Sequence, residues 1–159
     1  MQQKETVNNL EITELSDCPS EGRILALDLG TKRIGVAVSD ETRTIPRPLD
    51  MIPRNSWKKL LIAVRQTVSD FDAKALVIGL PYGFEGEETP MSTEARRLAR
   101  NFALSLDIPV FLQDERATSY EAKGRLWDQG LALRDAATLV DSEAAVIILS
   151  DFIDRLRLT

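Results

Sequence analysis

The sequence contains no histidine and only one cysteine, and these two shortages exclude several kinds of functional site. Without histidine there can be no Ser-His or Cys-His nucleophile pair, no histidine general base and no His-ligated zinc. The lone Cys18 excludes an intrachain disulfide and a cysteine-rich metal centre, and it favours a reducing, cytoplasmic compartment. Any catalysis must therefore use carboxylates, lysine, tyrosine, or a hard metal ion held by oxygen ligands.

Long apolar segments are also missing. No run approaches the ~20 residues needed to span a bilayer, and the N-terminus lacks the basic-then-apolar pattern of a secretory signal. The 159 residues fit one domain. Of the net charge of −5, residues 1–22 contribute five acids against Lys4, which leaves the remainder near neutral. We expect residues 1–22 to form a disordered acidic extension in front of a domain at 23–159.

Apolar patterning predicts a mixed α/β domain. We expect strands at 23–29, 33–40, 48–52, 74–79 and 109–113, of which the proline-bounded third lies at a sheet edge. We expect helices at 57–71, 92–106 and 140–156, and one more that begins near Thr118 and ends at Gly130. Three leading strands followed by alternating strands and helices predict a five-stranded sheet. It would be an antiparallel meander continued by parallel strands, with helices on both faces.

Acidic residues occur at three junctions of these elements. Asp28 interrupts the apolar run "ILALDLG", Glu115 follows the strand at 109–113, and Asp141 lies on the apolar stripe of the last helix. Each has an ordinary explanation: a turn contact for Asp28, solvation for Glu115, and first-turn helix chemistry behind Thr138 for Asp141. Together, three carboxylates at one sheet end would repel one another unless a cation lies among them. Oxygen-only ligands suit Mg²⁺ or Mn²⁺.

Four ordered blocks over residues 23–156 resemble the YqgF family: "RILALDLGTKRIGVAVSD", "LVIGLPYGFEGE", "PVFLQDERATSYEA" and "VDSEAAVIILSDFI". This is a family of RuvC-like pre-16S ribosomal RNA nucleases that are also described as Holliday junction resolvases. The resemblance implies an RNase H-like fold and a metal-dependent nuclease of ribosome biogenesis, acting in 5′-end maturation of pre-16S rRNA. It further implies that Asp28, Glu115 and Asp141 are the catalytic and metal-binding triad.

The chain departs from that family at two places. Only Arg134 represents the basic run that often precedes the last aspartate, and Ala144 occupies the position where RuvC-type nucleases tend to have a fourth acid. The first departure predicts weak contact with phosphate, and the second predicts weak metal binding. Because the body of the chain is also near neutral, we expect weak binding to free RNA and a substrate presented by a ribosomal particle or an accessory protein.

Basic side chains are the candidates for substrate contact. Thr31, Lys32 and Arg33 lie in the turn after Asp28, and Arg116 follows Glu115. A helix face with arginines at 96, 97 and 100 is interpreted as a solvated face rather than a phosphate-binding surface.

Three other functions remain open from the sequence. A branched-DNA resolvase would use the same acids. A non-catalytic RNA-binding assembly factor would keep them without using them. An actin-like ATPase would use "DLGTKRIG" as a phosphate loop, but that superfamily needs a second domain that 159 residues do not supply.

Overall fold

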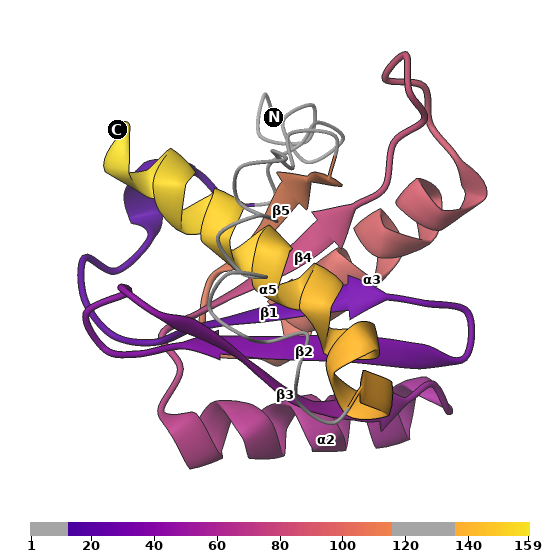
Figure 1. The fold of residues 1–159 in the computed structure, drawn as a ribbon, viewed down its shortest axis with the longest axis horizontal. Helices are drawn as coiled ribbons and strands as arrows, with labels where there is room; N and C mark the ends of the chain where they lie inside the picture. The colour runs from indigo at the N-terminus through magenta and orange to yellow at the C-terminus, as the bar shows by residue number, and fades with distance from the viewer. Residues whose placement is uncertain (1–12, 116–135) are drawn as a thin grey trace.

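The computed structural model describes residues 13–115 and 136–159, with the side chains of 136–141 outside the description (Figure 1). Its sheet has the strand order β3-β2-β1-β4-β5. The antiparallel part comprises β1 (Ile24–Leu29), β2 (Arg33–Ser39) and β3 (Pro46–Pro53). The strands β4 (Ala75–Leu80) and β5 (Val110–Asp114) continue the sheet in parallel from β1. The predicted meander, parallel continuation and edge strand are confirmed, although β3 extends beyond the expected 48–52.

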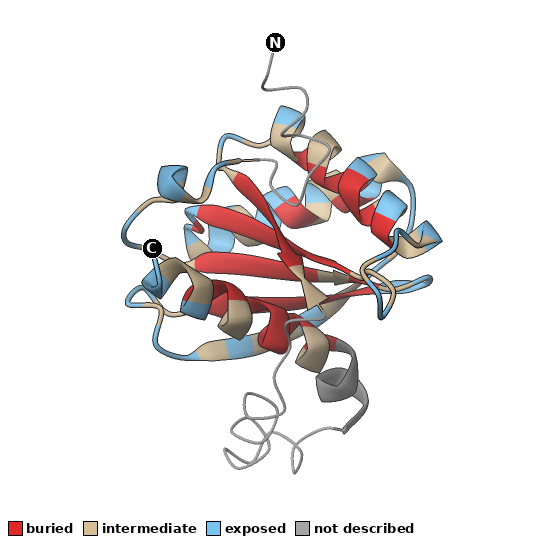
Figure 2. Ribbon diagram, turned by 90° about the horizontal axis from the view of Figure 1, so that it is seen from above, coloured by how far each residue is buried: buried red, intermediate tan, exposed pale blue. Residues whose placement is uncertain are grey.

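Helices cover both faces of this sheet, as predicted (Figure 2). On one face lie α2 (Trp57–Phe71), which matches the expected bounds, and α3 (Pro90–Ser105). Thr89 and Ser92 form a capping box that starts α3 two residues earlier than expected. On the other face lies α5 (Ala136–Arg157). The helix expected between Thr118 and Gly130 lies outside the described residues.

The last helix begins four residues earlier than the sequence predicted. Ala136 is its first residue, whereas we expected a start near 140. Alanine has the highest intrinsic helix propensity, so Ala136 and Ala137 extend the helix although no apolar periodicity predicts this extension. Asp141 is consequently the sixth residue of α5, and the interpretation of this residue as first-turn capping chemistry is wrong.

Strand β1 is apolar at consecutive positions because helices bury both of its faces. Leu25, Leu27 and Leu29 belong to the core under α2 and α3. Ile24 and Ala26 belong to the core under α5. Since side chains alternate along a strand, Asp28 lies on the α5 face. The fold therefore places a half-buried carboxylate between the sheet and its last helix.

Residues 13–22 contact the domain. The short 3-10 helix η1 (Leu15–Asp17) leads into this segment, and Leu15 and Cys18 pack against the apolar core beneath α5. The Arg43 Nε donates to the Gly22 carbonyl oxygen over 2.8 Å. The structure thus places packing contacts inside a segment for which we expected disorder, while residues 1–12 lie outside the description.

Candidate active site

Asp28 lies where the backbones around it leave room for its side chain. In the antiparallel ladder it pairs with Gly35 of β2. On the other side, Leu27 pairs with Ile78 of β4, so that the next residue of β4 beside Asp28 is Gly79. Two glycines flank Asp28 on the sheet, and neither contributes a side chain that would cover its carboxyl group.

Glu115 reaches the same place from the end of β5. It directly follows Asp114, which pairs with Leu80 at the carboxyl end of β4. A Cβ atom added to Gly79 would lie 3.1 Å from the Glu115 Cδ and 2.4 Å from the Ile148 Cδ1. The Glu115 side chain and α5 therefore occupy the space above Gly79. A glycine within a buried strand is the sequence signal for such a close approach, but the sequence analysis did not use it.

The Asp28 and Glu115 carboxyl groups form a hydrogen bond with each other. Burial raises the pKa of Asp28 to about 6, and the hydrogen bond with Glu115 partly offsets this effect. Burial also raises the pKa of Glu115 to about 8, helped by the negative charges of Asp28 and Asp114. Such a bond needs one proton between the two carboxyls, so the pair retains a proton near neutral pH. The structure thus brings together two of the three predicted acids.

The third predicted acid, Asp141, belongs to α5, and its side chain lies outside the description. Its neighbour Ser142 is fully buried and fixes this part of the helix to the sheet. The Ser142 hydroxyl accepts from the Val36 backbone N–H over 3.3 Å and donates to the Leu49 carbonyl oxygen over 2.7 Å. It thus bridges β2 and β3 at the register shift between Ile34 and Val36. The sequence analysis overlooked this serine.

The candidate substrate contacts in the turn between β1 and β2 are exposed: Thr31, Lys32 and Arg33. Backbone bonds shape this turn, since the Gly30 N–H donates to the Arg33 carbonyl oxygen over 2.9 Å. Arg54 supports this turn from outside. Its backbone N–H donates to the Lys32 carbonyl oxygen, and its guanidinium donates to the Gly30 carbonyl oxygen. Arg116 lies outside the described residues.

One interpretation of the basic residues is wrong. Arg96 does not lie on a solvated face, because only 7% of it is exposed and it pairs with Glu88. Arg97 is exposed and pairs with Glu94, as a solvated residue of this helix would.

A hollow of about 640 Å³ lies at the other end of the sheet and is not part of this site. Its lining includes Arg23, Arg43 and Lys74 together with Glu41 and Asp72. Arg23 precedes β1 and Lys74 precedes β4, whereas Asp28 and Glu115 lie at the carboxyl ends of the parallel strands. Open α/β sheets bind ligands at the carboxyl ends.

Within residues 13–115 and 136–159, no helix is long and apolar enough to cross a membrane. The same search range, which leaves out the Asp141 side chain, holds no cluster of three or more acidic or cysteine side chains arranged for a metal ion. The described part of the site is therefore the Asp28–Glu115 pair.

Known proteins resemble this chain over most of its length. A protein of Anaeromyxobacter dehalogenans named "Putative pre-16S rRNA nuclease" is 38% identical over 133 residues, which cover 84% of this chain and 97% of that protein. A protein of the same name from Acaryochloris marina is 39% identical over 131 residues, covering 82% and 91% of the two chains.

Solved structures share the fold at low sequence identity. Thermus thermophilus RuvC in complex with a Holliday junction substrate superposes with a TM-score of 0.55 at 15% identity. The match covers 86% of this chain and 96% of that one. The fowlpox virus Holliday junction resolvase has a TM-score of 0.50 at 15% identity, over 84% and 99% of the two chains. The RuvC likeness confirms the predicted RNase H-like fold.

The matching family profile is described as "RuvX: Holliday junction resolvase" and spans residues 22–155. That span includes Asp28, Glu115 and Asp141. Together with relatives near 38% identity, it shows that this chain is a member of the RuvX (YqgF) family.

Proposed function

We propose that this protein is a metal-dependent endonuclease that hydrolyses phosphodiester bonds in the 5′-end maturation of pre-16S rRNA, in the cytoplasm. The observation that supports it most directly is the half-buried Asp28–Glu115 pair at the carboxyl end of the sheet. A purely structural role does not explain two acids whose burial opposes their own ionisation. The names of the relatives supply the substrate.

The chemistry of the pair fits Mg²⁺ or Mn²⁺. The raised pKa of Glu115 indicates that the pair keeps a proton near neutral pH, and a divalent cation would replace that proton with a charge large enough to ionise both carboxyl groups. Asp28 and Glu115 would hold the ion, and Asp141, one residue before the anchored Ser142, is the proposed third ligand. When bound, such an ion activates water and stabilises charge on the phosphate. Thr31, Lys32, Arg33 and Arg116 are the proposed contacts to the nucleic acid.

Cleavage of a purified RNA tests the catalytic assignment. The substrate is a transcript of the 16S precursor 5′ region, incubated with protein and Mg²⁺ or Mn²⁺. Asp28→Asn preserves shape but removes a ligand charge, so we expect cleavage to fall by at least about 100-fold. Asp50→Asn is the matched control, because Asp50 is an exposed acid on the edge strand. Cleavage by Asp28→Asn at the wild-type rate would refute the assignment.

Branched DNA is the second candidate substrate, since the family description names a Holliday junction resolvase. Depleting the protein in its host separates the two candidates. Accumulation of 16S precursor, reversed by the wild-type gene but not by Asp28→Asn, supports RNA maturation. Unchanged precursor with accumulating DNA junctions supports the resolvase. Accumulation that Asp28→Asn reverses identifies a non-catalytic assembly factor.

A further inference from the structure

The loop between β4 and α3, residues 81–89, is a braced arm at the catalytic end of the sheet. It begins one residue after Leu80, which pairs with Asp114 next to Glu115. Figure 1 shows this loop projecting away from the body of the protein between β4 and α3. We call residues 81–89 the arm.

A tight hairpin turn forms the end of the arm. The Gly83 N–H donates to the Glu87 carbonyl oxygen over 3.0 Å, and the Gly86 N–H donates to the Gly83 carbonyl oxygen over 2.9 Å. Gly86 has a φ of +86°, the left-handed conformation that closes a three-residue hairpin loop. Phe84 and Glu85 are the two residues between these glycines, so the turn displays them at the tip.

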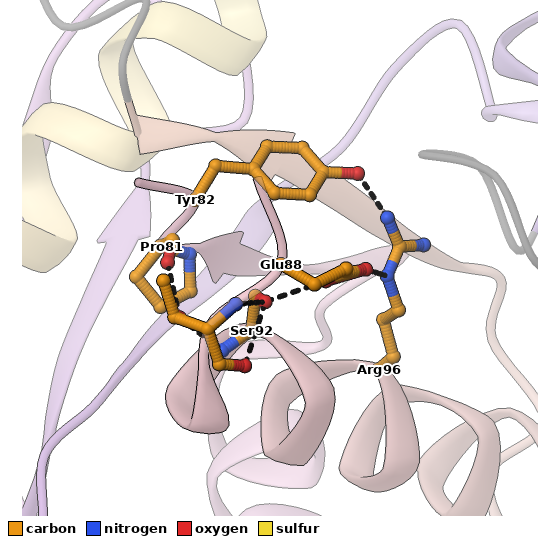
Figure 3. Close-up of polar contacts among 6 residues, drawn as sticks. Pro81, Tyr82, Glu88, Ser92 and Arg96 are labelled. Carbon is orange, nitrogen blue, oxygen red and sulfur yellow. Dashed lines mark hydrogen bonds and ion pairs between the residues drawn. The ribbon is translucent and has the colours of Figure 1, made fainter. Parts of the chain in front are cut away.

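Polar contacts brace the base of the arm (Figure 3). The buried Arg96 of α3 pairs with Glu88 over 2.6 Å and also donates to the Tyr82 hydroxyl. Thr89 Oγ1 donates to the Pro81 carbonyl oxygen over 2.8 Å, which ties the two ends of the arm together. Tyr82 itself packs against the core. The tip is therefore held by fixed contacts on both of its sides.

Phe84 is fully exposed at this tip. The exposed Glu85 and Glu87 make the surface beside it negative, whereas the charge of Glu88 is balanced by Arg96. No lysine or arginine occurs anywhere from residue 75 to residue 95. An exposed aromatic side chain on a braced turn, with two exposed carboxylates beside it in the chain, has the composition of a binding anchor.

The charge decides what kind of partner this anchor fits. A nucleobase stacked on Phe84 would bring its phosphates within about one Debye length, ~8 Å, of Glu85 and Glu87, where like charges repel. A basic protein surface with an apolar pocket would be attracted by the carboxylates and would bury the Phe84 ring. We propose that the arm docks the nuclease onto a basic protein of the particle that carries its RNA, with Phe84 as the anchor. This inference depends on the proposed function for the identity of the particle.

Binding to two probes tests the proposal. One probe is the small-subunit precursor particle purified from the protein's own host, and the other is the protein-free RNA extracted from the same particles. For Phe84→Ala we expect binding to the particle to weaken about thirtyfold, the loss typical of an anchor residue, with RNA binding unchanged. Leu104→Ala is the matched control, because Leu104 is also an exposed apolar residue but lies on α3. Glu85→Gln with Glu87→Gln should slow association with the particle and reduce its salt dependence.

Four other binding results would overturn the proposal. Equal weakening on particle and free RNA by Phe84→Ala identifies a base-stacking residue. No weakening on either, no particle binding by the wild-type protein, or an equal effect of Leu104→Ala removes the docking role. Cleavage is measured separately: Phe84-dependent particle binding without any cleavage refutes the proposed function alone. Asp28-dependent cleavage with Phe84-independent binding refutes the docking alone.

Discussion

Replacing Asp28 by asparagine should stabilise the metal-free protein at pH 8 and destroy its response to Mg²⁺. In the folded protein the pKa of Asp28 is raised from 3.8 to about 6, and that of Glu115 from 4.5 to about 8. The folded state therefore binds more protons than the unfolded state between about pH 4 and pH 8. Stability from this pair is greatest below that window and declines as the pH rises through it.

The size of the effect follows from these values. At 1.36 kcal/mol per pKa unit, ionising Asp28 in the folded protein costs on the order of 3 kcal/mol at pH 8. Asparagine avoids this cost and removes a charge beside Glu115, although its amide still has to be desolvated. A net gain of about 2 kcal/mol is expected, or about 5 °C in Tm for a protein of this size.

Urea denaturation measures both the stabilisation by Asp28→Asn without metal and the loss of the response to Mg²⁺. Wild type and Asp28→Asn are compared at pH 5 and pH 8, with EDTA and with millimolar Mg²⁺. In EDTA the variant should be more stable than wild type at pH 8, and the difference should shrink at pH 5. With Mg²⁺ at pH 8 the wild type should gain stability, because the ion binds the ionised pair, and the variant should gain far less. If EDTA-treated wild type is as stable as the variant at pH 8, the two carboxyls do not interact as the structure indicates. Asp50→Asn should follow the wild type throughout.

Three further outcomes are expected. Ser142→Ala should cost about 2–4 kcal/mol in urea denaturation, since it removes the hydroxyl that joins the Val36 N–H to the Leu49 carbonyl oxygen; unchanged protection of the Val36 amide in hydrogen exchange would contradict this. Gly79→Ala should cost about 1–3 kcal/mol by overpacking against Ile148, and it should also reduce Mg²⁺-dependent cleavage, because the new Cβ presses on the Glu115 side chain; cleavage at the wild-type rate would show that Glu115 is not needed in its present place. The logarithm of affinity for free single-stranded RNA should fall with the logarithm of salt concentration with a slope of about −1.5 to −2, as for two or three phosphate contacts; a slope steeper than about −5 in a filter-binding titration would reveal an extended basic groove.

Sequence patterns predicted the sheet because its signals are local. Consecutive apolar residues mark β1 and β4 as strands buried on both faces, and alternation marks β2, whose small α5-facing residues such as Ala37 let that helix pack closely. The prolines of β3 place it at an edge, where a missing N–H breaks no ladder bond. The start of α5 was not predictable from apolar spacing, since Ala136 contributes propensity and no periodicity.

The site was only partly predictable, for a physical reason. Asp28 is conspicuous because a charge interrupts an apolar strand, and Glu115 because it follows one. Ser142 and Gly79 are small residues whose roles depend on what approaches them from far along the chain. A serine that bridges two strands and a glycine that admits a glutamate look ordinary in sequence, because their partners are set by tertiary packing alone.

The distribution of charge connects the active site to the way in which a substrate reaches it. Lys32 and Arg33 are exposed near the carboxylate pair, but the arm on the same end of the sheet has a negative tip. Among the described residues at this end of the sheet, these two cations and the exposed Glu85 and Glu87 give little net attraction for a polyanion, whereas the proposed hydrolysis needs a phosphate held close to Asp28 and Glu115. Affinity that these described charges do not supply would come from another contact. Phe84 on its braced arm is the exposed group best suited to provide that contact among the described residues. A nuclease built in this way would cut free RNA slowly and RNA on its particle efficiently, which also limits the damage it could do to other transcripts.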